Sequence, residues 1–345
     1  MKPINPLLQR RAMMNKLERR IACEGKFTLP AVPALAGEYT TRCETVFCAL
    51  GRKLNVSERD RLQDILLSQL EKAFAASPRS SITVSYEASV GGLLNYVVTP
   101  VHSSLSSTYE GWVSTRQPPY FGVEPDAKVI AVANEFVEPS KSTVLDIGAG
   151  TGRNALALSR RGHTVDAVEL TPKFAEILSE SARKELLPIS VICQDVFQAK
   201  NVLRSEYELM VVSEVVSDFR STDQLSELLD LASQCLAKGG KLVMNVFIAK
   251  SHYSQDDAAK QFAQEVYSNF YLDTEMQALL KDLPLSLISD ESVYDFEMAN
   301  LPEGSWPPTP WYPDWASGLD IFNTSRDDSP VSLRWLVLQK NADSV

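Results

Sequence analysis

One short segment, Val144 to Arg153, limits most strongly what this chain can fold into. Its first half is apolar, as in a buried strand, and its second half carries glycine at every other position from Gly148 to Gly152. A strand that ends in a glycine turn and opens a helix lets bare backbone approach a ligand at the strand end. The segment therefore predicts an α/β domain with a ligand at the carboxyl edge of its sheet.

The alternation around this segment predicts the sheet. Short apolar runs separated by helical stretches are typical of parallel strands with helices on both faces. A long helix is expected from about Asp256 to Lys281, and a last strand, Val331 to Gln339, returns without a crossover helix and should pair antiparallel at the edge. The predicted fold is a doubly wound, mostly parallel, seven-stranded Rossmann-like sheet with an antiparallel edge strand. Earlier strands are expected at 143–147, 165–170, 189–194, 209–213 and 241–247, and the helices between them at 153–161, 172–185 and 222–237.

The first part of the chain has a different pattern. Residues 1 to about 80 have helical periodicity, with Ser57 as an expected helix cap, and residues 82–99 alternate around Gly91-Gly92 as in a β-hairpin. A stretch rich in Ser, Thr and Pro, residues 101–119, marks the boundary. We expect a helical accessory domain with a hairpin at 1–110 and a second domain at 111–345. The accessory domain would cover the active site or mediate dimerisation.

Charge and cysteine content limit the partners. The 34 basic and 44 acidic residues give a net charge of −10, which argues against nucleic acid as a substrate. The basic residues from Arg10 to Arg20 are interpreted as the solvent-exposed face of an amphipathic helix, with a membrane or nucleic-acid role as the alternative. The five cysteines include no CxxC pair, which fits free thiols and no zinc site. With no secretory leader and no long apolar run, we expect a cytoplasmic protein without a membrane span.

The glycine spacing distinguishes two cofactors. A dinucleotide loop is GxGxxG and uses the helix N-terminus to bind a pyrophosphate, whereas this loop is GxGxG and follows an acid, Asp146. S-adenosylmethionine (SAM) has no pyrophosphate, and its ammonium group suits a carboxylate such as Asp146. The spacing therefore favours SAM and disfavours a nucleotide-dependent dehydrogenase.

Polar residues at the next strand ends fit the same cofactor. Glu169 ends the second strand, where an acid accepts hydrogen bonds from both ribose hydroxyls. Asp195 and the backbone of Val196 follow the third strand, where they would bind the adenine edge. Ser213 and Glu214 end the fourth strand, beside the methionine end of the cofactor. The alternative is that solvent-facing strand ends are simply polar.

These motifs resemble those of class I SAM-dependent methyltransferases, and the segment Asp146 to Asn154 with Glu169 is most similar to the small tellurite-resistance-type subgroup. The resemblance covers residues 120–250 and includes the last strand. It implies a methyltransferase domain at 111–345 that uses SAM on a small-molecule acceptor with an O, N or S nucleophile. Ala149 stands where a cysteine is frequent, which backbone contacts should tolerate. The candidate cofactor residues are Asp146, Gly148, Ala149, Gly150, Gly152, Glu169, Leu170, Asp195, Val196 and Ser213. A non-catalytic SAM-binding sensor or scaffold remains the alternative.

The candidate residues on the acceptor side carry weaker signals. His252 and Tyr253, just beyond the fifth strand, could act as a base or hydrogen-bond donor, or could belong to a surface loop. Tyr120 and Phe121 follow Gln117-Pro118-Pro119, which differs from the [D/N]PP[Y/F] motif of DNA amino-methyltransferases in its first residue and its context. A lid role for Tyr120 and Phe121 is therefore preferred.

A loop rich in tryptophan and proline, residues 306–315, adds a further candidate. Trp311 and its neighbours could form an aromatic cage around a cationic or apolar acceptor, or could simply stiffen the loop by packing. The candidate substrate residues are Tyr120, Phe121, Glu214 and Trp311.

Overall fold

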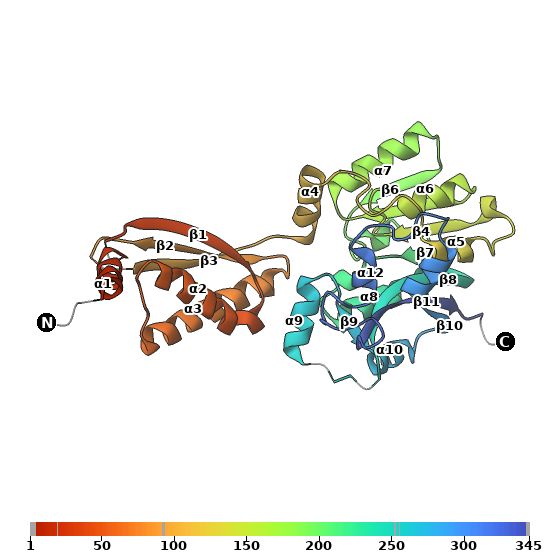
Figure 1. The fold of residues 1–345 in the computed structure, drawn as a ribbon. Coiled ribbons are helices and arrows are strands. Elements are labelled where there is room, and N and C mark those ends of the chain that lie inside the picture. The colour runs from red at the N-terminus through yellow and green to blue at the C-terminus, as the bar shows by residue number, and fades with distance from the viewer. Residues whose placement is uncertain (1–4, 19, 92–93, 252, 255, 343–345) are drawn as a thin grey trace. The chain divides into compact units, whose positions relative to one another are not determined.

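The structure is a computed structural model that describes residues 5–18, 20–91, 94–251, 253–254 and 256–342 (Figure 1). The chain forms two compact units that divide between Leu105 and Ser106. All five tryptophans lie in the second unit, so tryptophan fluorescence reports on that unit alone.

The N-terminal unit is a three-stranded antiparallel sheet covered by helices. The strands follow the order β1 (Cys23–Pro30), β2 (Ser81–Ala88) and β3 (Leu94–Val101). Helices α2 (Ala36–Ala49) and α3 (Val56–Ala76) connect β1 to β2 and pack on one face of the sheet (Figure 1). Their apolar side chains share a core with the strands, in which Phe47, Leu62, Leu66, Leu70 and Ile82 are fully buried. Helix α1 (Pro6–Glu18) precedes β1.

The predicted hairpin is present as β2 and β3, but strand β1 was not predicted. Residues 23–30 pair with β2 along its whole length, from Cys23 opposite Ala88 to Pro30 opposite Ser81. A pairing partner more than fifty residues away in the sequence sets this strand, and local propensity does not reveal it. The residue that caps α3 also differs from the predicted one. Asn55 caps this helix in place of Ser57, because its side chain accepts from the Glu58 amide at 3.0 Å while Glu58 accepts from the Asn55 amide at 2.8 Å.

The second unit contains the predicted Rossmann-like sheet. Strand order is β10-β11-β8-β7-β4-β5-β6, and a short strand, β9, pairs with β8. Strand β11 runs antiparallel to both β8 and β10, so the antiparallel strand lies one position in from the edge and β10 covers its outer side. The strands are β4 (Thr143–Ile147), β5 (Thr164–Glu169), β6 (Ile189–Cys193), β7 (Tyr207–Val212), β8 (Leu236–Ala249), β9 (Phe270–Leu272), β10 (Leu285–Ser292) and β11 (Val331–Lys340).

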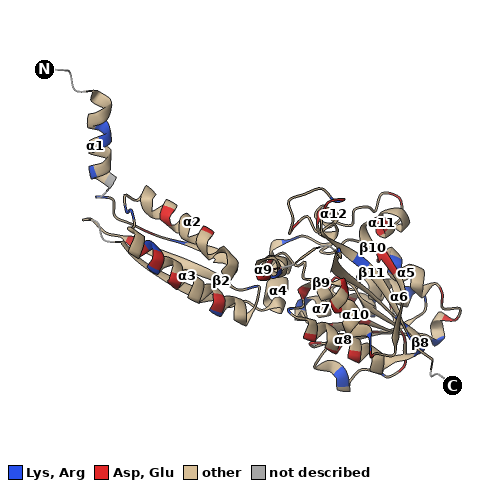
Figure 2. Cartoon of the chain, turned by 90° about the horizontal axis from the view of Figure 1, so that it is seen from below, with Lys and Arg blue, Asp and Glu red and all other residues tan. Residues whose placement is uncertain are grey.

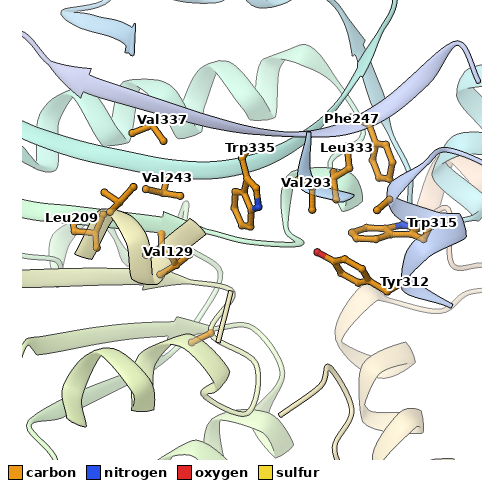
Figure 3. Packing of buried hydrophobic residues seen from close by; sticks show 14 of the residues in the cluster. Val129, Leu209, Val243, Phe247, Val293, Tyr312, Trp315, Leu333, Trp335 and Val337 are labelled. Carbon is orange, nitrogen blue, oxygen red and sulfur yellow. The ribbon is translucent and has the colours of Figure 1, made fainter. Parts of the chain in front are cut away.

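Helices cover both faces of this sheet, as the alternation of side chains along the strands requires. Leu209 of β7 belongs to the core cluster shared with α5, α6 and α7, while Met210 belongs to the cluster shared with α8. Figure 3 shows the first cluster, in which Val129, Leu209 and Trp335 pack together with aromatic residues of α12. The helices are α4 (Leu105–Thr115), α5 (Ala127–Ala133), α6 (Arg153–Arg160), α7 (Pro172–Lys184), α8 (Thr222–Cys235), α9 (Asp257–Glu265), α10 (Asp273–Leu280), α11 (Val293–Asn300) and α12 (Tyr312–Ala316).

The long helix predicted from Asp256 to Lys281 is wrong. Helix α9 ends at Glu265, strand β9 follows at Phe270–Leu272, and α10 begins at Asp273. Tyr267 has a left-handed backbone with φ of 57°, which ends the helix. Phe270 and Tyr271 are fully buried, so pairing with the end of β8 outweighs helix propensity here.

A buried carboxylate fixes the helix that precedes β4. Glu297 of α11 is 1% exposed and accepts hydrogen bonds from the amides of Ala127 and Lys128, at 2.8 and 3.1 Å, and from the Trp335 indole at 2.9 Å. The first two bonds satisfy amides at the start of α5, whose own cap residue makes no such bond. One side chain therefore joins α5, α11 and β11.

We predict that Glu297→Ala lowers the free energy of unfolding of the second unit by about 3 kcal/mol, because three buried donors lose their acceptor. Urea unfolding followed by tryptophan fluorescence measures this change. As a control, Glu180→Ala on the exposed side of α7 should change it by less than about 0.5 kcal/mol, since Glu180 makes only a helical ion pair with Lys184. Equal stability of the two variants would show that the Glu297 bonds contribute little.

Candidate functional site

The glycine loop after β4 has a backbone that only glycine adopts easily. Gly148, Gly150 and Gly152 have φ of 70°, 55° and 96°. A Cβ built on Gly148 would lie 2.2 Å from Cγ2 of Val215, so a side chain there would clash with the segment after β7. The amides of Gly148 and Ala149 donate to the carbonyl of Val168, at 2.8 and 3.1 Å, which ties the loop to the neighbouring strand β5.

Glu169 at the end of β5 joins this loop to the start of α7. One carboxylate oxygen accepts from the Gly150 amide at 2.8 Å and the other from the Thr171 amide at 2.6 Å. The side chain is 6% exposed, and burial raises its pKa although both hydrogen bonds oppose the rise. Each oxygen keeps a second lone pair, so the carboxylate can still accept from a ligand's hydroxyl groups.

Asp146, two residues before the loop, has an unsatisfied oxygen. Its side chain is buried, and among the described residues its Oδ2 atom has no hydrogen-bond partner. Burial, followed by the nearby Asp126, raises the pKa of Asp146 to about 7. A cationic group beside Asp146 would donate the hydrogen bond that Oδ2 lacks. Its positive charge would also stabilise the ionised carboxylate.

The remaining predicted cofactor residues lie at the strand ends, as the sequence suggested. Asp195, after β6, accepts from the Phe197 amide at 2.9 Å, and Val196 between them is buried. Leu170 follows Glu169 and is partly exposed. Ser213, after β7, donates to Asp126 at 2.7 Å. These positions are compatible with the predicted roles, which remain predictions.

A buried ionic network beside the loop was not predicted. The Arg153 guanidinium, at the start of α6, contacts Asp126 at 2.5 Å and Glu214 at 2.7 Å. Asn154 donates to Asp126 at 2.8 Å and accepts from its amide at 2.9 Å. Burial acts to lower the pKa of Arg153, but Asp126 and Glu214 raise it overall, so the guanidinium stays charged. From the sequence, Arg153 is identified only as the residue after the glycines, because the partners of its guanidinium come from distant segments.

Glu214 has an unusual backbone in this network. Its φ is 59°, in the left-handed region, and its amide donates to the Asn245 side chain on β8 at 2.7 Å. Burial raises the pKa of the Glu214 carboxyl, and Arg153 opposes that rise. A non-glycine residue held in this conformation by a neighbouring strand is a frequent mark of a functional position.

The two predicted lid residues lie against the loop. The Phe121 ring comes within 3.3 Å of a Cβ built on Gly150, so it covers the bare backbone there. Phe121 and Tyr120 both contact Phe174 of α7, with ring centroids 5.4 and 5.7 Å apart. Tyr109 of α4 extends this aromatic group and donates from its hydroxyl to Asp218 at 2.7 Å. The segment before α5 therefore packs over the glycine loop.

Tyr253 and Trp311, two other acceptor-side candidates, have different aromatic partners. His252 lies outside the described residues. The Tyr253 ring packs on Phe270 and Phe322, with centroids 5.8 and 5.5 Å apart, so this partly buried ring lies against the hydrophobic core. Trp311 is partly exposed and contacts Tyr312 and Trp315. Catalytic roles for His252 and Tyr253 and a substrate role for Trp311 remain predictions.

Comparison with known proteins agrees with this geometry. The family model of the methyltransferase domain matches residues 144–240, from the middle of β4 into β8. The chain carries a class I SAM-dependent methyltransferase domain. The probable SAM-dependent methyltransferase TehB of Haemophilus influenzae is 29% identical over 149 residues, covering 41% of this chain and 49% of that protein. The probable non-canonical nonribosomal peptide synthetase CymA of Salinispora arenicola is 34% identical over 102 residues, covering 29% of this chain and 1% of that protein.

A solved structure shows the fold of the methyltransferase domain. Geranyl diphosphate methyltransferase in complex with SAM superposes with a TM-score of 0.50 at 15% identity, covering 62% of this chain and 85% of that one. The chain spans about half, or less, of the length of the curated relatives named above. No helix in the described ranges is long and apolar enough to cross a membrane.

The cofactor of this methyltransferase domain is SAM, and three features of the site fit it. The glycine loop offers backbone without side chains, Glu169 offers two oxygens to a ribose, and the unpartnered Asp146 oxygen suits an ammonium group. The loop does not offer a free row of amides for a pyrophosphate, because Gly148, Ala149 and Gly150 donate within the protein.

We predict that Gly148→Ala destabilises the methyltransferase domain by about 2 kcal/mol, because the new Cβ meets Val215 and the backbone is left-handed. Gly111→Ala is the matched control. Gly111 lies in α4, and outside its own stretch of helix no atom of the described residues comes within 4 Å of a built Cβ, so this change should leave stability unchanged or raise it by up to about 1 kcal/mol. Urea unfolding of both variants, followed by tryptophan fluorescence, tests the difference, and similar values would contradict the loop geometry.

Proposed function

We propose that this chain transfers a methyl group from SAM to a small-molecule acceptor in the cytoplasm. The observation that carries the proposal is the Glu169 carboxylate, held by the amides of Gly150 and Thr171 at the mouth of a bare glycine loop. The matched methyltransferase domain includes both the loop and Glu169.

The residues of the chain would act by alignment. SAM supplies a methyl group on a positively charged sulfur, which a nucleophile displaces in line. Holding the two reactants in that line provides most of the rate enhancement, and a base is needed only when the acceptor arrives protonated. In this proposal Glu169 holds the ribose, Asp146 the ammonium group, and Asp195 with Val196 the adenine.

Charge supports a small acceptor over nucleic acid. The chain has a net charge of −10, and acidic residues (red) recur along α2, α3 and α8 in Figure 2. The five cysteines are free thiols, which suits the cytoplasm.

We propose that the N-terminal unit, placed at about residues 1–110, covers the active site or forms a homodimer. The division of the chain after Leu105 supports treating it as a separate module.

Glu169→Ala tests the cofactor role. We predict that SAM binding weakens by about 1 to 3 kcal/mol, because two hydrogen bonds to the ribose are lost. Isothermal titration calorimetry measures it, with Glu180→Ala as a surface control and NAD as a control ligand that should not bind. Unchanged SAM affinity in Glu169→Ala would contradict the assignment. Formation of S-adenosylhomocysteine with candidate acceptors separates an enzyme from a non-catalytic SAM-binding module.

SAM affinity should also depend on pH through Asp146. Without ligand its pKa is raised to about 7, so the carboxyl is largely protonated at pH 6. The SAM ammonium group favours the ionised form and lowers that pKa, so binding near pH 7 releases a proton and tightens as pH rises from about 6 to about 8. Calorimetry in buffers of different ionisation enthalpy measures the proton release. Asp146→Asn should bind more weakly and lose this release, and a release that persists in the variant would assign the proton to another group.

A further inference from the structure

Tyr312 presents a buried hydroxyl that nothing in the proposed function uses. The residue begins α12 and is 2% exposed, and among the described residues its oxygen has no hydrogen-bond partner. Its ring is fixed by edge or tilted contacts with Trp306, Trp311 and Trp315, at centroid distances of 5.9, 5.9 and 5.6 Å. Figure 3 shows the hydroxyl extending from α12 toward the region of Val293 and Trp335. A fixed ring with an unsatisfied buried hydroxyl is costly unless a ligand completes it.

The ionisable groups around this hydroxyl are mainly acidic. Burial raises the Tyr312 pKa well above its usual value, and Glu214, Asp126 and Glu297 raise it further, while Arg153 acts in the opposite direction. The hydroxyl therefore stays protonated and serves as a donor. Arg153 forms ion pairs with Asp126 and Glu214, and Glu297 is the third carboxyl group near this hydroxyl. A bound anion would add to this excess of acidic groups, whereas a neutral or cationic group would not.

Glu214 and Asp126, two of these acidic groups, are tied to the segment beside the cofactor loop. Glu214 follows β7, the strand that pairs with β4, and Ser213 is bonded to the Asp126 carboxylate. Val215, directly after Glu214, fills the space beside Gly148. The left-handed backbone of Glu214 and its bond to Asn245 fix where its side chain leaves the strand end. In a sheet of this topology, ligands bind outside the carboxyl ends of the central strands.

We propose that Tyr312 and Glu214 hold the methyl acceptor, and that the acceptor is a neutral or cationic molecule bearing an N–H or O–H group, and not an anion. This inference rests on the proposed function. Glu214 accepts a hydrogen bond from the N–H or O–H of the acceptor, and the Tyr312 hydroxyl donates one to a second polar atom of it. Both act as positioning residues for the nucleophile. The inference excludes anionic acceptors.

The test compares matched probes on the full chain saturated with S-adenosylhomocysteine. 3-Methoxypropylamine, 3-methoxy-1-propanol and 3-methoxypropionate form one set, and 2-methoxybenzylamine, 2-methoxybenzyl alcohol and 2-methoxybenzoate form a second. Each probe carries an ether oxygen that can accept from the Tyr312 hydroxyl. Saturation-transfer NMR and titration calorimetry measure binding of each probe. We expect an amine or an alcohol to bind in at least one set and the carboxylate of that set to bind at least about tenfold more weakly. Binding of neither amine nor alcohol, or preference for the carboxylate, overturns the inference.

Variants assign the binding to these two side chains. Tyr312→Phe and Glu214→Ala should each weaken the bound probe about tenfold, because each removes one buried hydrogen-bonding group. Tyr294→Phe is the matched control, since its ring also contacts Trp306, at 5.0 Å, from the neighbouring helix α11. It should bind the probe as the unaltered chain does. Thermal unfolding checks that each variant is folded, and Tyr312→Phe loses only one oxygen atom.

Affinity for S-adenosylhomocysteine separates the two claims. If the unaltered chain does not bind S-adenosylhomocysteine, the proposed function fails. If the unaltered chain and Tyr312→Phe bind S-adenosylhomocysteine with about the same affinity and also bind the probe equally well, only the acceptor assignment fails.

Discussion

The hydrogen bond from the Gly150 amide to the Glu169 carboxylate is the constraint on which the rest of the site depends. It joins a loop after β4 to the end of β5, and the second oxygen of Glu169 joins the same point to α7 through Thr171. The loop can approach because its glycines have left-handed backbones and carry no side chains. A ligand that contacts Glu169 therefore meets bare backbone on one side and a carboxylate on the other.

A second set of contacts stabilises the helix that enters the domain. Asp126 receives hydrogen bonds from Arg153, Asn154 and Ser213, so it cannot cap α5 itself. Glu297 accepts from the first amides of α5 in its place and from the indole of Trp335. Burying so many carboxyl groups around one guanidinium has a cost in desolvation, and such a network is more readily explained by binding than by stability alone.

The sequence predicted the local parts of this arrangement well. The patterns that succeeded are short-range: the glycine spacing, Glu169 and the strand–helix alternation. Each predicts local structure, because glycine frees the backbone and periodicity indicates which side chains share a face. The family resemblance extended those patterns to a cofactor. These signals predicted the Rossmann-like sheet of the second unit, while the cofactor residues stay predictions.

The parts that were missed depend on contacts between distant segments. Strand β1 exists because of its pairing with β2, and β9 because Phe270 and Tyr271 are buried against β8. Arg153 was visible after the glycines, but its partners Asp126 and Glu214 lie 27 and 61 residues away, and Tyr312 comes from a loop whose packing no periodicity describes. Burial and charge at such points arise only when the chain has folded.

A crystal structure of the chain with S-adenosylhomocysteine would show whether Glu169 and the glycine loop bind the nucleoside together. Both ribose hydroxyls should lie within hydrogen-bond distance of the Glu169 carboxylate, and the nucleoside should cross the backbone of residues 148–152. A nucleoside bound elsewhere, or a Glu169 side chain turned away from it, would rule out this cofactor site.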